Sequence, residues 1–135
     1  MNYNVFTWYE YSSFYFRGNK NVVNKINEIG LNKCSISEIT IAELKYCATK
    51  SDKPDFHNKV LNTFSDSIDI ISIIEVLDSY AFEKVRLEKA GNRIDDFDLL
   101  IGATAIANEL ILVTNNTKHL QRMSLKNIED WTIWI

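Results

Sequence analysis

The segment from Ile94 to Thr114 constrains the fold of this chain more than any other part of its sequence. It places three carboxylates, Asp95, Asp96 and Asp98, directly before an apolar run with helical spacing, and a short apolar strand follows after a very tight connection. A helix joined so closely to a strand is typical of an α/β unit. Acidic residues at the mouth of such a unit can hold a divalent cation for phosphodiester chemistry, but they are also good helix N-caps. The segment therefore predicts local structure and leaves function open.

Strands and helices are predicted to alternate along the rest of the chain. The strands are expected at Tyr3–Tyr9, Cys34–Ser37, Ile68–Ile71, Leu110–Thr114 and the alternating tail Trp131–Ile135. The helices are expected at Lys20–Ile29, from Thr40 to about Ala48, from Pro54 onward, at Glu75–Ala90 with Gly91 as the stop, and at Asp95–Asn108. This alternation predicts an α/β sandwich with a mostly parallel sheet, in which ligands bind at the carboxyl ends of the strands.

Length and composition indicate one ordinary globular domain over residues 1–135, with 46% hydrophobic and 24% charged residues. A net charge of −3 argues against strong nonspecific attraction to nucleic acid, although a local basic face remains compatible with it. Cys34 and Cys47 fit neither a disulfide framework nor a zinc motif, so we expect buried free thiols in a reducing compartment. No stretch approaches the roughly 20 apolar residues of a membrane span, and we expect a soluble, cytoplasmic protein.

Two acidic residues share an expected position at the carboxyl edge of the sheet. Glu43 and Asp98 each follow a loop, in the first turn of a predicted helix. Each also has a purely structural interpretation. Glu43 completes a capping box with Thr40, and Asp98 lies at the positive end of a helix that Asp95 would cap. The residue types alone leave both interpretations open.

Four segments together resemble the PIN-domain ribonucleases, and within them the VapC toxins of bacterial toxin–antitoxin pairs. They cover most of the chain from Arg17 to Trp131 and read FYFRGNKNVVNKI, SISEITIAELKYCA, GNRIDDFDLLIGATAIA and LVTNNTKHLQRMSLKNIEDW. The last two, in that order and at that spacing, are the more specific. The resemblance implies a PIN-like α/β/α sandwich. It also implies a metal-dependent endoribonuclease that cuts structured RNA, often tRNA, around one or two Mg²⁺ or Mn²⁺ ions.

The resemblance also implies partners. A cognate, VapB-like antitoxin would hold the toxin in check. An amphipathic antitoxin helix would lie in a groove between the apolar and aromatic N-terminal helices. Two copies would form a homodimer whose acidic sites face a shared RNA groove.

Motif position suggests which residues would form the site. Glu43 in ITIAEL looks like the family's glutamate, and Asp98 in DDFDLLIGATA looks like its central aspartate, so both would be metal ligands. Asp95 would be an auxiliary ligand, and Asn115 or Asn116 would orient a water or a phosphate. Mg²⁺ prefers hard oxygen ligands and keeps several waters, so two or three protein carboxylates suffice. A bound ion lowers the pKa of its water and stabilises charge on the attacked phosphate.

The chain departs from the family near position 8. The family's first strand ends in an aspartate, but here Trp8 stands at the expected place and Glu10 is the only acidic residue nearby. His119 is a second departure, at a position where many relatives carry an acidic residue. Three explanations remain open for Trp8: lost or muted activity, substitution by Glu10, or a different register of the N-terminal segment. A second hypothesis therefore stands beside the enzyme: a catalytically impaired PIN module that binds an antitoxin, and RNA, without cleavage.

Basic and aromatic side chains have both functional and ordinary interpretations. The residues that could contact RNA phosphates are Arg17, Lys20, Arg93, Lys118 and Arg122. Each is individually more typical of a solvated surface charge, and both histidines, His57 and His119, are more typical of surface residues than of metal ligands. The aromatic cluster between Phe6 and Phe16 could stack on bases, but its density fits core and partner contacts better.

Overall fold

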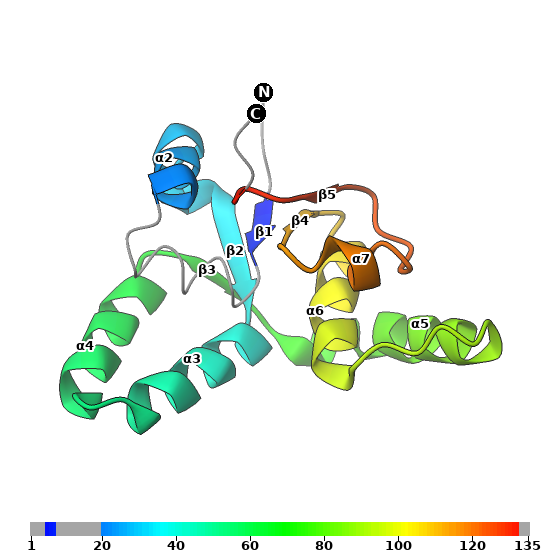
Figure 1. Ribbon diagram of the computed structural model, residues 1–135, viewed down its shortest axis with the longest axis horizontal. Helices are drawn as coiled ribbons and strands as arrows, with labels where there is room; N and C mark the ends of the chain where they lie inside the picture. The colour runs from blue at the N-terminus through cyan, green and yellow to red at the C-terminus, as the bar shows by residue number, and fades with distance from the viewer. Residues whose placement is uncertain (1–4, 8–19, 133–135) are drawn as a thin grey trace.

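Five parallel strands among the described residues form a sheet at the centre of the fold (Figure 1). The computed structural model describes residues 5–7 and 20–132, and the expectations that fall on the other residues lie outside these ranges. The strand order is β3-β2-β1-β4-β5, and every paired neighbour runs parallel. The strands are β1 (Val5–Thr7), β2 (Cys34–Ser37), β3 (Asp69–Ile71), β4 (Ile111–Val113) and β5 (Ile128–Glu129). The predicted parallel α/β sheet is confirmed.

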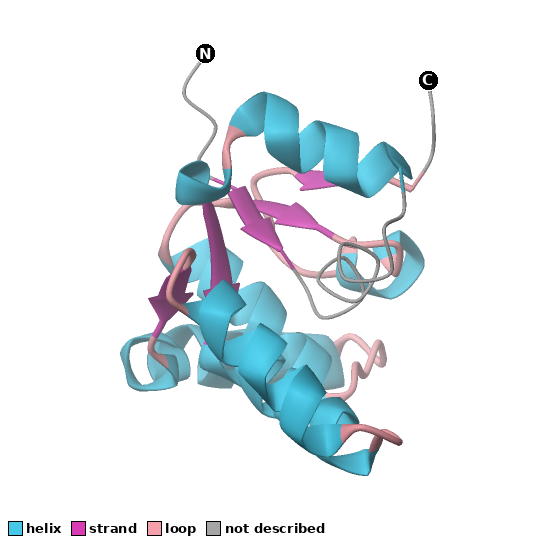
Figure 2. Ribbon diagram, turned by 90° about the vertical axis from the view of Figure 1, so that its left-hand side faces the viewer, coloured by secondary structure: helices cyan, strands magenta, loops and turns pink. Residues whose placement is uncertain are grey.

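Helices lie on both sides of the strands (Figure 2). The α-helices are α2 (Lys20–Ile29), α3 (Glu38–Lys50), α4 (Pro54–Ser65), α5 (Leu77–Lys89), α6 (Asp96–Ala107) and α7 (Thr117–Leu120). Two 3₁₀ turns, η1 (Leu31–Lys33) and η2 (Ile73–Val76), precede β2 and α5. A membrane-spanning helix would need about 20 apolar residues, and no helix within the described ranges meets that requirement.

Two apolar clusters fill the space between the helices and the sheet. Leu112 and Val113 are consecutive in β4, so their side chains point to opposite faces. Val113 packs with residues of α2, α3 and α4, whereas Leu112 packs with residues of α5, α6 and α7. The three layers form the predicted α/β/α sandwich.

Helix α3 begins earlier than the sequence suggested. The predicted capping box of Thr40 and Glu43 is wrong, because Ser37 at the end of β2 is the N-cap and accepts a hydrogen bond from the Ile39 amide at 3.0 Å. Thr40 is instead buried inside the first turn. Glu43 consequently lies in the second turn of α3 and has no capping role.

The ends of α5 and α6 follow the predictions more closely. Gly91 has a φ of 71° just after α5, and the amide of Asn92 closes the helix on the Leu87 carbonyl at 2.9 Å. Asp95 caps α6 by accepting a hydrogen bond from the Phe97 amide at 3.2 Å. The short loop between these two caps fixes the position of the acidic segment.

Two other expectations need correction. The last described strand, β5, lies before Trp131, and the predicted strand Trp131–Ile135 is wrong where the structure describes it. Asp130 accepts a hydrogen bond from the Thr132 amide at 2.9 Å, which makes a turn there, and Trp131 packs in the core. Both cysteines are free, but only Cys34 is buried, and burial raises its thiol pKa to about 11. Cys47 is exposed.

Candidate active site

The acidic segment lies at the carboxyl edge of the sheet. Strand β2 leads directly into α3, strand β4 leads through a short loop to α7, and the N-terminus of α6 is at the same edge (Figure 1). Helices α3 and α6 are in contact with each other. Ligand sites of parallel α/β sheets form at this edge, because loops and helix N-termini gather there.

Asp98 is the group whose electrostatics the structure perturbs most clearly at this edge. It lies in the first turn of α6, as predicted, and its side chain is half-buried. The pKa of the Asp98 carboxyl is raised to about 6, chiefly by burial and then by the neighbouring charge of Asp95, while His119 acts in the opposite direction. A carboxylate that is desolvated and placed beside a like charge is stabilised by a cation.

Asn116 reaches Asp98 from the loop after β4. Its Nδ2 atom donates to Oδ2 of Asp98 over 3.5 Å, a long hydrogen bond. Its backbone amide donates to Oγ1 of the fully buried Thr114 at 3.0 Å, which fixes the start of the loop. Asn115 is exposed. Of the two asparagines suggested by the sequence, the structure therefore brings Asn116 to the aspartate.

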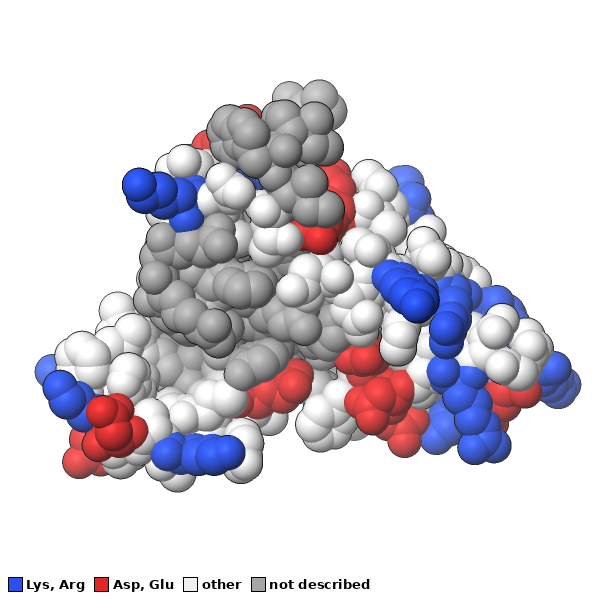
Figure 3. Space-filling view, in the orientation of Figure 1, with Lys and Arg blue, Asp and Glu red and all other residues white. Residues whose placement is uncertain are grey.

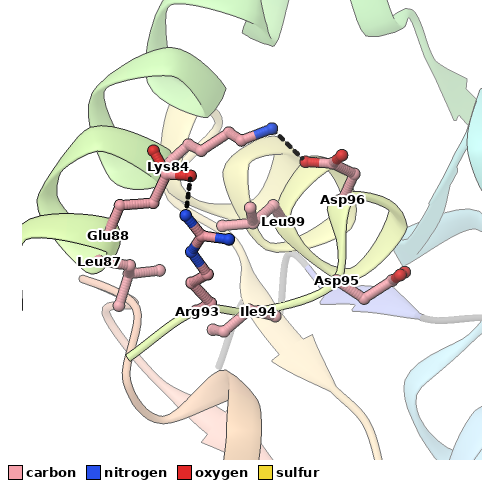
Figure 4. Close-up of a pocket in the computed structure, with 8 residues that line it drawn as sticks. All are labelled: Lys84, Leu87, Glu88, Arg93, Ile94, Asp95, Asp96 and Leu99. Atoms are coloured by element: carbon pink, nitrogen blue, oxygen red, sulfur yellow. Dashed lines mark hydrogen bonds and ion pairs between the residues drawn. The ribbon is translucent and has the colours of Figure 1, made fainter. Parts of the chain in front are cut away.

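Asp95 and Asp96 point in different directions from the start of α6 (Figure 4). Asp96 turns toward α5, where Tyr80 Oη and Lys84 Nζ each donate to its Oδ1 at 2.9 Å. These contacts hold the pKa of Asp96 below its usual value. The side chain of Asp96 is 56% exposed, and its ion pair with Lys84 ties α5 to α6. Asp95 remains beside Asp98 as a second carboxylate.

Glu43 approaches from α3 as a half-buried residue whose Oε1 atom is fully buried. Among residues 5–7 and 20–132, no three His, Cys, Asp or Glu side chains gather closely enough to hold a metal ion. The structure thus joins Asp98 to Asn116, with the charges of Asp95 and His119 acting on Asp98, and leaves Glu43 on the adjacent helix. Trp8 and Glu10 lie outside the described residues.

The donor atoms that are present fit a hard divalent cation. The carboxylate oxygens of Asp98 and Asp95 are the ligand type that Mg²⁺ and Mn²⁺ accept, with water filling the remaining positions. The raised pKa of Asp98 points the same way, because the charge that burial disfavours is the one a cation would compensate.

Sequence reasoning missed a buried acidic residue on α5. Glu83 is 1% exposed and accepts hydrogen bonds from Arg86 Nε at 2.8 Å and from the Ser124 amide at 2.6 Å. These bonds hold the pKa of Glu83 below its usual value although burial opposes them. The three-residue spacing of Glu83 and Arg86 is visible in the sequence, but the contact with Ser124 spans 41 residues. Glu83 thereby anchors the segment after α7.

Comparison with known proteins identifies the family. The sequence model of the PIN domain family matches residues 6–125 of this chain. The chain belongs to the PIN domain family. The PIN chain is 37% identical to "Ribonuclease VapC2" of Rickettsia felis over 101 residues, 74% of this chain and 75% of that protein. It is 32% identical to "tRNA(fMet)-specific endonuclease VapC" of Shigella flexneri, again over 101 residues, 74% of this chain and 76% of that protein.

Solved structures agree with this assignment. A chain in the Rickettsia felis VapBC2 complex with a DNA fragment from its promoter matches with a TM-score of 0.84 and 29% identity, covering 94% of this chain and 98% of that one. DNA-bound VapBC from Salmonella typhimurium matches with a TM-score of 0.87 over 96% of this chain and 98% of that one. The sequence identity to the Salmonella typhimurium chain is 23%, so this second similarity supports the fold assignment only. The resemblance to PIN domains and VapC proteins noted from the sequence is confirmed.

Proposed function

We propose that this PIN domain is a metal-dependent endoribonuclease, the toxin of a toxin–antitoxin pair. The observation that carries the proposal is the half-buried Asp98 carboxyl, whose pKa is raised beside Asp95 and whose oxygen meets the Asn116 amide. Perturbed carboxylates at the ligand-binding edge of an α/β sheet are typical of functional sites. Similarity to proteins named as VapC ribonucleases supplies the reaction class.

Each residue of the site has a proposed role. Asp98 and Glu43 would hold Mg²⁺ or Mn²⁺, with Asp95 as an auxiliary ligand. The ion, when bound, supplies an acidified water and neutralises charge on the attacked phosphate. Asn116, fixed through Thr114, would orient a phosphate oxygen or the attacking water by its side-chain amide. Lys84 and Tyr80 keep Asp96 engaged with α5 and so leave Asp95 and Asp98 to the site.

Partners follow from the same relatives. Structured RNA such as tRNA is the proposed substrate, because two of the similar proteins are named tRNA(fMet)-specific endonucleases. A VapB-like antitoxin is the proposed regulator, because the matched solved structures are VapBC complexes. An apolar hollow of about 510 Å³, lined by Leu31, Phe56, Val60 and Phe64, offers surface for its amphipathic helix. We further propose a cytoplasmic homodimer.

A binding-only module is the second candidate, and Trp8 favours it. The family's first strand carries an aspartate where this chain has Trp8, and loss of one carboxylate weakens a Mg²⁺ site. Such a module would retain the antitoxin and RNA surfaces and would not cut.

Cleavage of total tRNA by the purified protein distinguishes the two candidates. We expect cutting with Mg²⁺ or Mn²⁺, none with EDTA, and none by Asp98→Asn, which also controls for a contaminating nuclease. Asp96→Asn is the matched variant and should retain cutting, because Asp96 is bound to α5. No cutting by a folded protein, followed by cutting after Trp8→Asp, would establish the binding-only module and locate its defect at position 8.

A further inference from the structure

Three arginines from separate segments meet beside the acidic site. Arg86 belongs to α5, Arg93 to the loop before α6, and Arg122 to the turn after α7. Arg122 Nη1 donates to the Arg93 carbonyl at 3.4 Å, and Arg86 Nη2 donates to the Arg122 carbonyl at 2.8 Å. The three segments are therefore held together by the arginine side chains themselves.

Only two of these arginines are available to a ligand. Arg86 is engaged by Glu83 through Nε at 2.8 Å and Nη2 at 3.2 Å, so its charge is compensated inside the protein. The side chain of Arg93 is 82% exposed and has one ion pair, to Glu88 at 3.7 Å. A pair this long and this exposed contributes little and is easily exchanged for another anion. Arg122 is half-buried and donates one hydrogen bond to the Arg93 carbonyl.

Both available arginines adjoin the candidate active site. Arg93 lies two residues before Asp95, and Arg122 lies three residues after His119, whose charge acts on Asp98. Arg93 and Asp95 line the same hollow of about 220 Å³ between α5 and the start of α6 (Figure 4). Figure 3 shows basic side chains gathered over α5 and α7, next to acidic side chains at the start of α6.

The two arginines can offset the repulsion between the acidic site and an RNA substrate. RNA is a polyanion, and the carboxylates of the site, in a chain of net charge −3, repel it. Guanidinium groups bind phosphate oxygens through paired N–H donors and supply most contacts to nucleic acid backbones together with lysine. The geometry points to Arg93 and Arg122 as a binding site for the RNA phosphodiester backbone beside the scissile phosphate. This inference rests on the proposed function for the position of that phosphate.

Binding of a short fluorescein-labelled single-stranded RNA, measured by anisotropy in EDTA over a series of salt concentrations, tests the inference without cleavage. The double variant Arg93→Gln/Arg122→Gln should bind more weakly at low salt. Its slope of log K against log salt should be shallower by about 1.4, since each lost phosphate contact on a single strand removes roughly 0.7. The double variant Arg93→Lys/Arg122→Lys should retain most of the slope.

The matched control removes two exposed charges elsewhere. Lys33→Gln/Lys53→Gln changes η1 and the turn before α4 and should leave the slope unchanged. The inference would be overturned if Arg93→Gln/Arg122→Gln left the slope unchanged. It would also be overturned if the control Lys33→Gln/Lys53→Gln reduced the slope by the same amount. Thermal unfolding shows whether each variant is folded. If the variant that contains Arg122→Gln does not fold, the single variant Arg93→Gln, which changes only an exposed side chain, is used for the test instead. If the protein binds RNA through these arginines but never cuts it, the proposed ribonuclease function would be wrong, whereas the assignment of Arg93 and Arg122 as a phosphate-binding site would stand.

Discussion

Glu83→Ala is expected to lower the free energy of unfolding by about 2–4 kcal/mol, because it removes the buried carboxylate of a partly buried ion pair. The buried carboxylate holds Arg86 and the Ser124 amide, so its loss leaves these partly buried donors without their acceptor and frees the segment after α7. The cost lies below that of a fully buried pair because the Arg86 side chain is 38% exposed and regains water.

Urea unfolding of the wild type, Glu83→Ala and Glu83→Gln at neutral pH measures this effect. Glu83→Gln keeps an acceptor for Ser124 and should cost less than Glu83→Ala. The pKa of Glu83 is lowered in the fold, so its charge stabilises above the carboxyl pKa of the unfolded chain, and this stabilisation is lost as pH falls through the lower folded pKa. The stability difference between wild type and Glu83→Gln should therefore shrink in acid. Equal stability of all three proteins at neutral pH would show that this network is not a structural anchor.

Asp98→Asn is expected to stabilise the metal-free protein at neutral pH, by about 1–2 kcal/mol. The pKa of Asp98 is about 6 in the fold against an ordinary value of 3.8, and a shift of that size corresponds to roughly 3 kcal/mol before solvent screening at a half-buried site reduces it. Between these two pKa values the folded protein holds a proton that the unfolded chain has released. Wild-type stability therefore falls as pH rises from about 4 through 6.

Unfolding free energies in EDTA, measured between about pH 4 and pH 8, test this prediction. The advantage of Asp98→Asn should be complete above the folded pKa and absent near pH 4. Asp96→Asn is the control with the opposite sign: its pKa is lowered by Lys84 and Tyr80, so neutralising it should destabilise at neutral pH. Wild type and Asp98→Asn with parallel pH profiles would contradict the assigned environment of Asp98.

Local sequence signals predicted most of the elements but not how they are arranged. Gly91 and Asp95 mark the ends of α5 and α6 through backbone chemistry that their own neighbours determine. The spacing of Thr40 and Glu43 matches a capping box, but the end of β2 makes Ser37 the N-cap of α3. The central position of β1 in the sheet depends on pairings across the whole chain, which no local pattern shows.

The sequence likewise predicted individual residues of the candidate site but not the contacts between them. Asp98 and Asp95 stand out in sequence as acids before an apolar helix, and the structure gives Asp98 the perturbed environment that a functional acid needs. What separates Asp96 from them is its contact with Tyr80 and Lys84, which lie on a different helix. The approach of Asn116 to Asp98 crosses 18 residues, and that of Arg122 to Arg93 crosses 29. Such contacts follow from packing and are invisible to spacing.

Titration of the purified wild type with Mn²⁺, followed by the electron paramagnetic resonance signal of the free ion, tests the central claim that the Asp98 site holds a divalent cation. We expect one site per chain, competed by Mg²⁺, lost in Asp98→Asn and weakened in Glu43→Gln. Asp96→Asn, the same charge change two residues away, should retain it. Mn²⁺ binding that survives Asp98→Asn unchanged, or a wild type that binds none, would contradict the account.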